Sequence, residues 1–217
     1  MILLIDLNLA GKEVLIVGGG QVGERKAKNF LDEKSEVTIA SKNFSQTIKQ
    51  LSKDGKISLE EIDLSLTPEL LDPLISKAEV VIATTTDSKL NKKIANKARK
   101  NRAIVCVVDD PSNSDFSNIA IAKVGDVKIA VYTAGKSPAM ARVLRQKIEK
   151  ILTPQDILQV KLQEYIRTFA KDRIASKSER KKVLYYLIRN REVNGLLING
   201  ELDEAKSVAK KIIESRL

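Results

Sequence analysis

The stretch Val17-Gly18-Gly19-Gly20-Gln21-Val22-Gly23 decides the fold of this chain, because it places three glycines at the spacing Gly-x-Gly-x-x-Gly. The residues before Gly18, Glu13-Val14-Leu15-Ile16-Val17, form an apolar, β-branched run that predicts a buried strand. After the glycines, apolar residues recur at helical spacing up to Leu31. The glycines therefore lie on a turn from strand to helix, which is the context in which this spacing predicts dinucleotide binding.

Each glycine answers a separate physical need in such a turn. Gly18 allows the chain to turn tightly, Gly20 lets the backbone approach a pyrophosphate, and Gly23 lets the helix pack against the strand. The first helical residues, Gln21 and Val22, then present unpaired backbone N–H groups to the phosphates. The alternative is a glycine turn that serves the fold alone and binds no ligand.

Apolar runs and helical patterns alternate along the first half of the chain. Such alternation predicts an α/β fold of the Rossmann type, a doubly wound parallel sheet with helices on both faces. The expected strands are 13–18, 36–40, 57–62, 79–84 and 103–108, and the expected helices are 21–32, 43–53, 67–77 and 88–101. Because ligands of such sheets bind at the carboxyl ends of the strands, polar residues that follow the strands are candidates for the site.

Two groups of polar residues at that edge are candidates for cofactor contacts. Ser41 and Lys42 follow the second strand, where a dinucleotide site usually has an acid for the adenosine ribose. Taken alone they could accept a 2′-phosphate, which favours NADP, and the alternative is that Ser41 caps a helix. The run Thr84-Thr85-Thr86 follows the fourth strand and could line the nicotinamide half. Thr86 or Asp87 is also expected to cap the next helix.

A pair of acids, Asp109-Asp110, closes the fifth strand just before Pro111. Adjacent acids at the end of a strand are costly if they are buried and unpaired. The chain has no histidine, so acid–base chemistry must come from other groups, and Asp109 is the natural candidate for a general base. The alternative is that the acids cap a loop before the proline.

The pattern changes after Pro111. Two apolar runs flank Gly125-Asp126 and predict a β-hairpin with a two-residue turn. Ser137 and Pro138 are expected to cap and to begin a helix, and the rest of the chain has a helical pattern only. The expected elements are strands at 119–124 and 127–132 and helices at 138–152, 155–172, 178–191 and 201–215.

The helix that is expected after Ser137 carries two candidate residues, Arg142 and Arg145. They lie three positions apart and face one side, so they could meet an acidic substrate, or they could be a solvated face. The preceding Gly135-Lys136-Ser137 is not a phosphate-binding P-loop, because that motif requires a glycine where Ala130 stands.

Composition narrows the classes of partner. The 217 residues carry a formal net charge of +10, which favours an anionic partner. Four Phe, four Tyr and no Trp are few stacking platforms, so we expect no specific binding to nucleic acid. No apolar run is long enough to span a bilayer and the opening apolar run is too short for a signal peptide, so we expect a cytoplasmic protein with no membrane contact.

The chain has no histidine and only one cysteine, which excludes several kinds of catalytic and metal site. Ser-His-Asp and Cys-His catalysis and any His-ligated metal site are ruled out, and we expect no metal site. Cys106 cannot form an internal disulfide and lies in an apolar run, which favours a buried structural thiol.

Three motifs together resemble the precorrin-2 dehydrogenase family, the N-terminal family of siroheme synthases, some of whose members also chelate iron. They are Val-Gly-Gly-Gly-x-Val-x-x-Arg-Lys-Ala at 17–27, Val-Val-Asp-Asp-Pro at 107–111 followed by Asp115-Phe116, and Gly-x-Ser-Pro-x-x-Ala-Arg-x-x-Arg at 135–145. The resemblance covers about residues 1–152. Three positions depart from the family's pattern: Lys42 stands for proline, Cys106 for asparagine and Ala134 for glycine.

The resemblance implies a reaction. NAD would take a hydride from precorrin-2 and a proton would be lost, which gives sirohydrochlorin. Asp109 occupies the position of the family's key catalytic residue, and Thr133 that of a hydroxyl residue near its tetrapyrrole site. The family's usual NAD preference favours NAD here, although Lys42 leaves NADP open. Iron insertion into sirohydrochlorin is open as an additional activity, and a regulatory module that senses NAD(P) without catalysis is the alternative function.

The resemblance also implies an organisation. It predicts an NAD-binding domain at 1–112, a dimerisation segment of hairpin and helix at 113–152, and a small all-helical C-terminal domain at 153–217. A homodimer is therefore expected. The substrate would be a tetrapyrrole with many carboxylates, which a basic cleft attracts and orients. We expect Thr133, Ser137, Arg142 and Arg145 to contact it.

Overall fold

The computed structural model describes residues 3–117 and 119–215, which divide into two compact units on either side of residue 118. Each unit has apolar clusters of its own. The predicted boundary after residue 112 falls shortly before this division. The predicted boundary after residue 152 falls within the second unit and stays a prediction.

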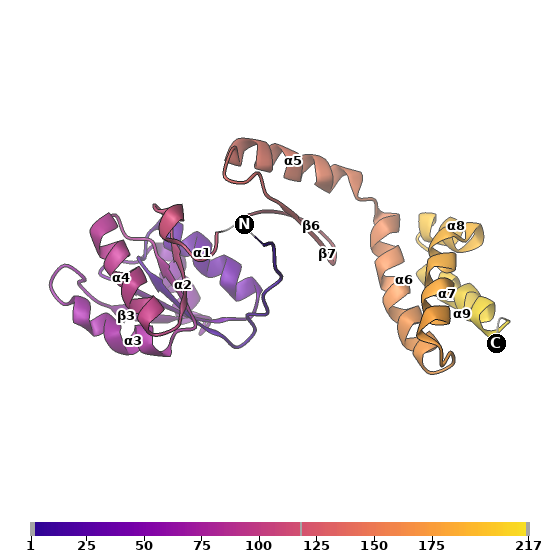
Figure 1. The fold of residues 1–217 in the computed structure, drawn as a ribbon, viewed down its shortest axis with the longest axis horizontal. Coiled ribbons are helices and arrows are strands. Elements are labelled where there is room, and N and C mark those ends of the chain that lie inside the picture. Colours follow the sequence, from indigo (N-terminus) through magenta and orange to yellow (C-terminus); the bar gives the residue numbers. More distant parts are fainter. Residues whose placement is uncertain (1–2, 118, 216–217) are drawn as a thin grey trace. The chain divides into compact units, whose positions relative to one another are not determined.

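A five-stranded parallel sheet forms the centre of the first unit (Figure 1). Its order is β3-β2-β1-β4-β5, so the chain leaves β1 toward one edge and returns to pair on its other side. This confirms the predicted doubly wound sheet. The strands are β1 (Glu13–Val17), β2 (Glu36–Ser41), β3 (Ser58–Glu61), β4 (Val80–Ala83) and β5 (Ile104–Val107).

Helices cover both faces of the sheet. Alternate residues of β1 point to opposite faces, so Val14 and Ile16 join one apolar cluster while Leu15 and Val17 join the other. The first cluster includes Phe30 of α1 and residues of α2, and the second includes residues of α3 and α4. The helices are α1 (Gln21–Asp32), α2 (Gln46–Lys53), a 3₁₀ turn at Pro68–Leu71 followed by α3 (Asp72–Lys77), and α4 (Ser88–Lys100).

The second unit begins with the predicted hairpin and helix. Strands β6 (Ala120–Val124) and β7 (Val127–Val131) pair antiparallel, and α5 (Pro138–Ile151) packs against them. Ser137 caps α5 as predicted, since its hydroxyl accepts the backbone N–H of Met140 at 3.1 Å.

Four helices complete the second unit around one apolar cluster. They are α6 (Pro154–Lys171), α7 (Lys177–Arg189), α8 (Arg191–Ile198) and α9 (Leu202–Glu214). The sequence did not predict α8, and this is a correction. Burial of Val193 and Leu197 and the cap from Asn190 hold that short helix, although Gly195 lies inside it. None of the helices in the described residues is long and apolar enough to cross a membrane.

Candidate functional site

A groove of about 920 Å³ runs along the carboxyl ends of the first four strands, and no described residue after the fifth strand lines it. That volume is in the range of pockets that bind small ligands and cofactors. The groove spans the point where the strand order reverses between β1 and β4, which is where ligands of doubly wound sheets bind. The predicted cofactor residues that line it are Gly18, Gly20, Gln21, Ser41, Lys42, Thr84, Thr85 and Thr86. Val22 and Gly23 do not line it and lie in the first turn of α1.

The three glycines have different reasons to be glycine. A Cβ on Gly18 would lie 2.5 Å from the hydroxyl of Thr84, and a Cβ on Gly23 would lie 2.0 Å from the carbonyl oxygen of Gly18. Packing alone therefore excludes side chains at these two positions. A Cβ on Gly20, by contrast, would meet nothing within 4 Å, although Gly20 lines the groove.

The N-terminus of α1 borders the groove, because Gly20 and Gln21 line it. Gly20 is its N-cap residue and supplies no side-chain cap, so the first backbone N–H groups have no side-chain partner. Free N–H groups and the helix dipole favour an anion at this position. The open space at Gly20 and the uncapped α1 therefore fit the pyrophosphate of a dinucleotide.

Lys42 is not a free cation, because its Nζ lies 2.7 Å from the Oδ2 atom of Asp63. Asp63 follows β3, lines the groove, and also accepts hydrogen bonds from the backbone N–H and the hydroxyl of Ser65. The bonds from Lys42 and Ser65 lower the pKa of Asp63 to about 2, so this carboxylate is ionised at neutral pH. Ser41 ends β2, and Ser45 caps the next helix, so the interpretation of Ser41 as a helix cap is wrong.

The threonines after β4 form hydrogen bonds with neighbouring segments at the edge of the sheet. The Thr84 hydroxyl donates to the carbonyl oxygen of Val17 at 3.0 Å, and so links the ends of β4 and β1. The Thr85 hydroxyl donates to Oδ1 of Asn91 at 2.7 Å. Thr86 is exposed in the groove, and Asp87 rather than Thr86 caps α4.

Asp109 lies beyond the end of β5, where α4 supplies two hydrogen-bond donors to its carboxylate. The hydroxyl of Ser88 donates to Oδ2, and the side-chain amide of Asn91 donates to Oδ1 at 3.0 Å. These bonds, that from Ser88 above all, hold the pKa of Asp109 below its usual value of 3.8. Asp109 itself is exposed, so an ionised carboxylate faces solvent at this edge.

The acids next to Asp109 have structural partners. Asp110 accepts the backbone N–H of Asn113 and so caps a 3₁₀ turn at Pro111–Asn113. Asp115 pairs with Arg99 at 3.0 Å and accepts the backbone N–H of Val105 at 2.9 Å. All three acids meet side chains of α4: Lys92 lies 3.7 Å from Asp110 and Arg99 pairs with Asp115, whereas Asp109 accepts hydrogen bonds from Ser88 and Asn91 at the start of the helix.

The motif after the glycines divides into an exposed and a buried cation. Arg25 is exposed, whereas Lys26 is only 5% exposed, and its Nζ lies 3.8 Å from the Cys106 sulfur. Burial lowers the pKa of Lys26. Cys106 is buried in an apolar cluster, as predicted.

The predicted substrate residues belong to the second unit. Thr133 and Ser137 close the turn between β7 and α5, because the Thr133 hydroxyl donates to the carbonyl oxygen of Ser137 at 3.1 Å. Arg142 is exposed on α5, and Arg145 forms an ion pair with Glu149 one turn later. The structure therefore gathers Asp109 and the cofactor candidates in one unit and the substrate candidates in the other.

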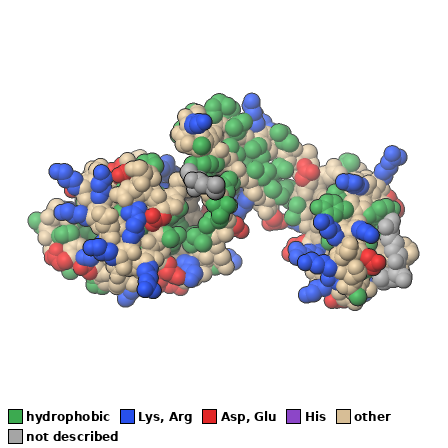
Figure 2. Space-filling view, in the orientation of Figure 1, with side chains coloured by type: hydrophobic (Ala, Val, Ile, Leu, Met, Phe, Trp, Pro, Cys, Tyr) green, Lys and Arg blue, Asp and Glu red, His purple; other side chains and the backbone are tan. Residues whose placement is uncertain are grey.

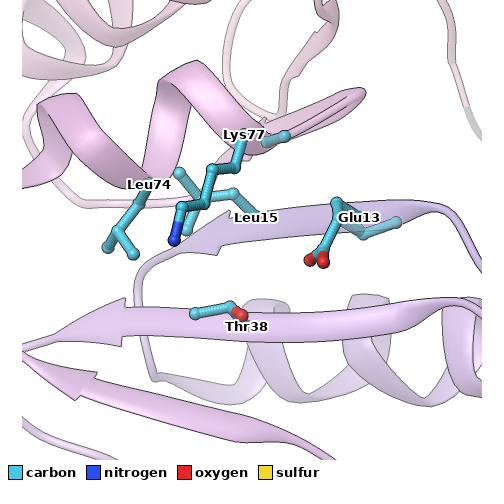
Figure 3. A pocket seen from close by; sticks show the side chains of 7 residues that line it. Glu13, Leu15, Thr38, Leu74 and Lys77 are labelled. Carbon is cyan, nitrogen blue, oxygen red and sulfur yellow. The ribbon is translucent and has the colours of Figure 1, made fainter.

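Another cavity in the described residues is too small for a cofactor. A cavity of about 40 Å³ lies under α3, where Lys77 reaches over β1 and β2 near Glu13 and Thr38 (Figure 3). This cavity has room for little more than water and lies away from the glycine turn. Residues 3–117 and 119–215 hold no cluster of three acids or cysteines that could bind a metal ion.

Comparisons with known proteins agree with this geometry. The family model described as "Putative NAD(P)-binding" matches residues 5–120. A precorrin-2 dehydrogenase of Methanosarcina barkeri is 35% identical over 97% of this chain and 93% of that protein. A siroheme synthase of Yersinia pseudotuberculosis is 30% identical over 98% of this chain but only 44% of that longer protein. The solved structure of SirC, a precorrin-2 dehydrogenase, matches with a TM-score of 0.76 over 97% of this chain and all of that one, at 20% identity, and so supports the fold.

Proposed function

Because this chain belongs to the precorrin-2 dehydrogenase family, an NAD(P)-binding family of oxidoreductases, we propose that it oxidises precorrin-2 to sirohydrochlorin in siroheme biosynthesis. The observation that carries the proposal is that the glycine turn and Asp109 lie at the same edge of the sheet. It combines an open glycine turn at Gly20 with an ionised carboxylate, Asp109, held by two hydrogen bonds. A regulatory module that only senses NAD(P) would have no need for that carboxylate.

Asp109 has the properties of a general base in this reaction. Precorrin-2 loses a hydride and a proton, and a bound NAD supplies the hydride acceptor. Asp109 is ionised at neutral pH, exposed, and held in orientation, so it can accept the proton that the macrocycle loses. Gly20 and the N-terminus of α1 would hold the pyrophosphate, and Thr85 and Thr86 line the part of the groove nearest α4.

We further propose that NAD is preferred over NADP. The charge of Lys42 is already engaged by Asp63, and the Asp63 carboxylate would repel a 2′-phosphate in the groove. The same carboxylate can accept hydrogen bonds from ribose hydroxyls, which is the role of the acid that is missing after β2. Asp63→Asn should therefore free Lys42 and shift the ratio of kcat/KM values about tenfold toward NADP. Glu61→Gln, at the end of β3 but outside the groove, is the matched control.

We also propose that the second unit forms a homodimer interface and contacts the substrate. Apolar side chains gather over α5 and the hairpin (Figure 2), and the exposed ones are Ile121, Met140, Val143, Leu144 and Ile151. An exposed apolar face of this kind on a two-stranded hairpin, which is marginally stable alone, fits a second copy of the chain. Introducing Asp at Val143 and Leu144 should convert a dimer to a monomer in analytical ultracentrifugation, whereas Ile198→Asp on α8 should not.

The decisive test is anaerobic incubation of the purified protein with precorrin-2 and either NAD or NADP. Reduced cofactor and the absorption spectrum of sirohydrochlorin should appear together. Asp109→Asn should lower kcat about 10² to 10⁴-fold with unchanged cofactor affinity, because general bases contribute about that much. Asp110→Asn, which retains an oxygen that can cap the 3₁₀ turn, should keep most of the activity. Absence of turnover by the wild-type protein with either cofactor would contradict the proposal.

Two expectations from the sequence stay predictions. Iron insertion into sirohydrochlorin is measured separately, by adding ferrous ion to sirohydrochlorin without NAD and following the spectrum of the product. The cytoplasmic location is measured by fractionation of cells that express the chain.

A further inference from the structure

Asn91 is a buried polar residue that takes no direct part in the proposed transfer of hydride and proton. It is 0% exposed and lies on α4, where the other buried residues are Ile94, Ala95 and Ala98. An apolar side chain is the ordinary choice at such a position, since asparagine is a weak helix former and a buried amide is costly without partners. Its presence therefore calls for a specific set of hydrogen bonds.

The side-chain amide of Asn91 uses its full hydrogen-bonding capacity. Its Oδ1 accepts from the backbone N–H of Thr85 at 3.2 Å and from the Thr85 hydroxyl at 2.7 Å. Its Nδ2 donates to the carbonyl oxygen of Thr85 and to Oδ1 of Asp109, both at 3.0 Å. Two donors and two acceptor positions are all that a primary amide has. One buried group thus joins the loop after β4 to the carboxylate after β5.

The two oxygens of Asp109 are held in different ways. Oδ1 is fixed by the buried amide of Asn91, whereas Oδ2 accepts from Ser88, which is exposed on the first turn of α4. Solvent or substrate can replace a bond to an exposed hydroxyl, whereas the donor of the other bond, the Asn91 amide, is buried. Lys92 and Asp110 are the other charged groups near this carboxylate, and both are at least partly accessible.

We propose that Asn91 is a positioning residue that fixes Asp109 against the threonine loop of the cofactor groove, with Oδ2 directed to the substrate as the proton acceptor. This inference rests on the proposed dehydrogenase function. Displacement of a reacting group by about 1 Å can lower a rate about 10²-fold, so a buried bridge between cofactor loop and base has a direct kinetic consequence.

The test is Asn91→Asp, which has the same shape. The new side chain can still accept both bonds from Thr85, but it cannot donate to Asp109. We expect kcat for precorrin-2 to fall at least tenfold while KM and the NAD dissociation constant change less than threefold. Asn96→Asp, the same change at an exposed position of α4, is the matched control. Carbon-13 NMR of the Asp109 carboxyl should show its titration moved to higher pH in Asn91→Asp and unmoved in Asn96→Asp.

A second variant separates positioning from stability. Asn91→Ala buries no charge and should show the same loss of kcat if the protein remains folded by circular dichroism. Unchanged kcat and Asp109 titration in a folded variant, or failure of both variants to fold, would overturn the positioning role. If the wild-type protein does not oxidise precorrin-2, the proposed function fails, and the NMR titration still tests the link between Asn91 and Asp109.

Discussion

The edge of the sheet in the first unit differs from the hairpin and α5 in the second unit in how its side chains are held. At the edge, Thr84, Asn91 and Asp109 are linked to neighbours by hydrogen bonds, and Thr84 lines the groove. On α5, Arg142, Val143 and Leu144 are exposed. The polar groups of the first region are therefore held by bonds within the protein, whereas the second region presents a surface whose role depends on what binds it.

The largest effect should come from adding a methyl group to Gly23. Its Cβ would lie 2.0 Å from a backbone oxygen of Gly18, so Gly23→Ala should cost about 3 kcal/mol of stability and abolish NAD binding. Gly20→Ala is the contrast, because its Cβ enters open space: stability should change by about 1 kcal/mol or less while NAD affinity falls at least tenfold. Thermal unfolding and calorimetric titration measure both. Equal losses in the two variants would contradict these separate roles of the two glycines.

The next largest effect should come from the exposed arginine on α5. Arg142→Glu reverses a charge that could meet a substrate carboxylate, so KM for precorrin-2 should rise about tenfold with little change in kcat. Arg145→Glu should have a smaller effect on KM, since Arg145 is already paired with Glu149. Lys150→Glu, later on the same helix, controls for net charge. An unchanged KM in Arg142→Glu would remove Arg142 from the substrate surface.

A smaller effect is expected at Ser88. The hydrogen bond from its hydroxyl is the main cause that lowers the pKa of Asp109, so the acid limb of kcat/KM in the wild-type protein should lie below the pH range of an ordinary aspartate. A base with a lowered pKa becomes protonated, and so stops accepting a proton from the substrate, only at low pH. Ser88→Ala should raise the pKa of Asp109. The acid limb should therefore move to higher pH, with kcat/KM at pH 7.5 within about threefold of the wild type. A pH profile that does not move would contradict the bond between Ser88 and Asp109.

The smallest effect concerns the turn before α5. Ala134 has φ = 54°, a left-handed conformation that costs an alanine about 1 kcal/mol but suits glycine. Ala134→Gly should therefore stabilise the protein by up to about 1 kcal/mol without a change in activity, as judged by denaturant unfolding. Gly135→Ala, at φ = 73°, should destabilise it. The same sign in both variants would exclude this explanation.

Much of the fold follows from local sequence patterns. The five strands, the hairpin around Gly125-Asp126 and the cap at Ser137 were predicted because periodicity, turn residues and capping residues act over a few positions. The helix at Arg191–Ile198 was missed because Gly195 and the Asn199-Gly200 pair are typical of a break, and only burial in the unit's core outweighs them.

The candidate site was harder to predict, because its contacts join residues far apart in the sequence. Asp63 reaches Lys42 only because β2 and β3 end side by side, so the acid that is missing after one strand comes from the next. Asn91 could have been found from the sequence, since it shares the helical stripe of Ile94, Ala95 and Ala98 and is the one polar member of that set. Its partners, however, depend on how α4 lies against β4 and β5.

The close approach of Gly18 to Thr84 also has a consequence for the order of folding. The two residues are 66 positions apart, and β4, which Thr84 follows, pairs with β1 only after β2, α2, β3 and α3 have been made. Long-range pairing of this kind is slow relative to helix formation. During synthesis, the first three strands can therefore assemble early, but we expect affinity for the dinucleotide to appear only after α4 and β5 have left the ribosome. The glycine turn is thus among the first parts of the chain to be synthesised and among the last to become functional.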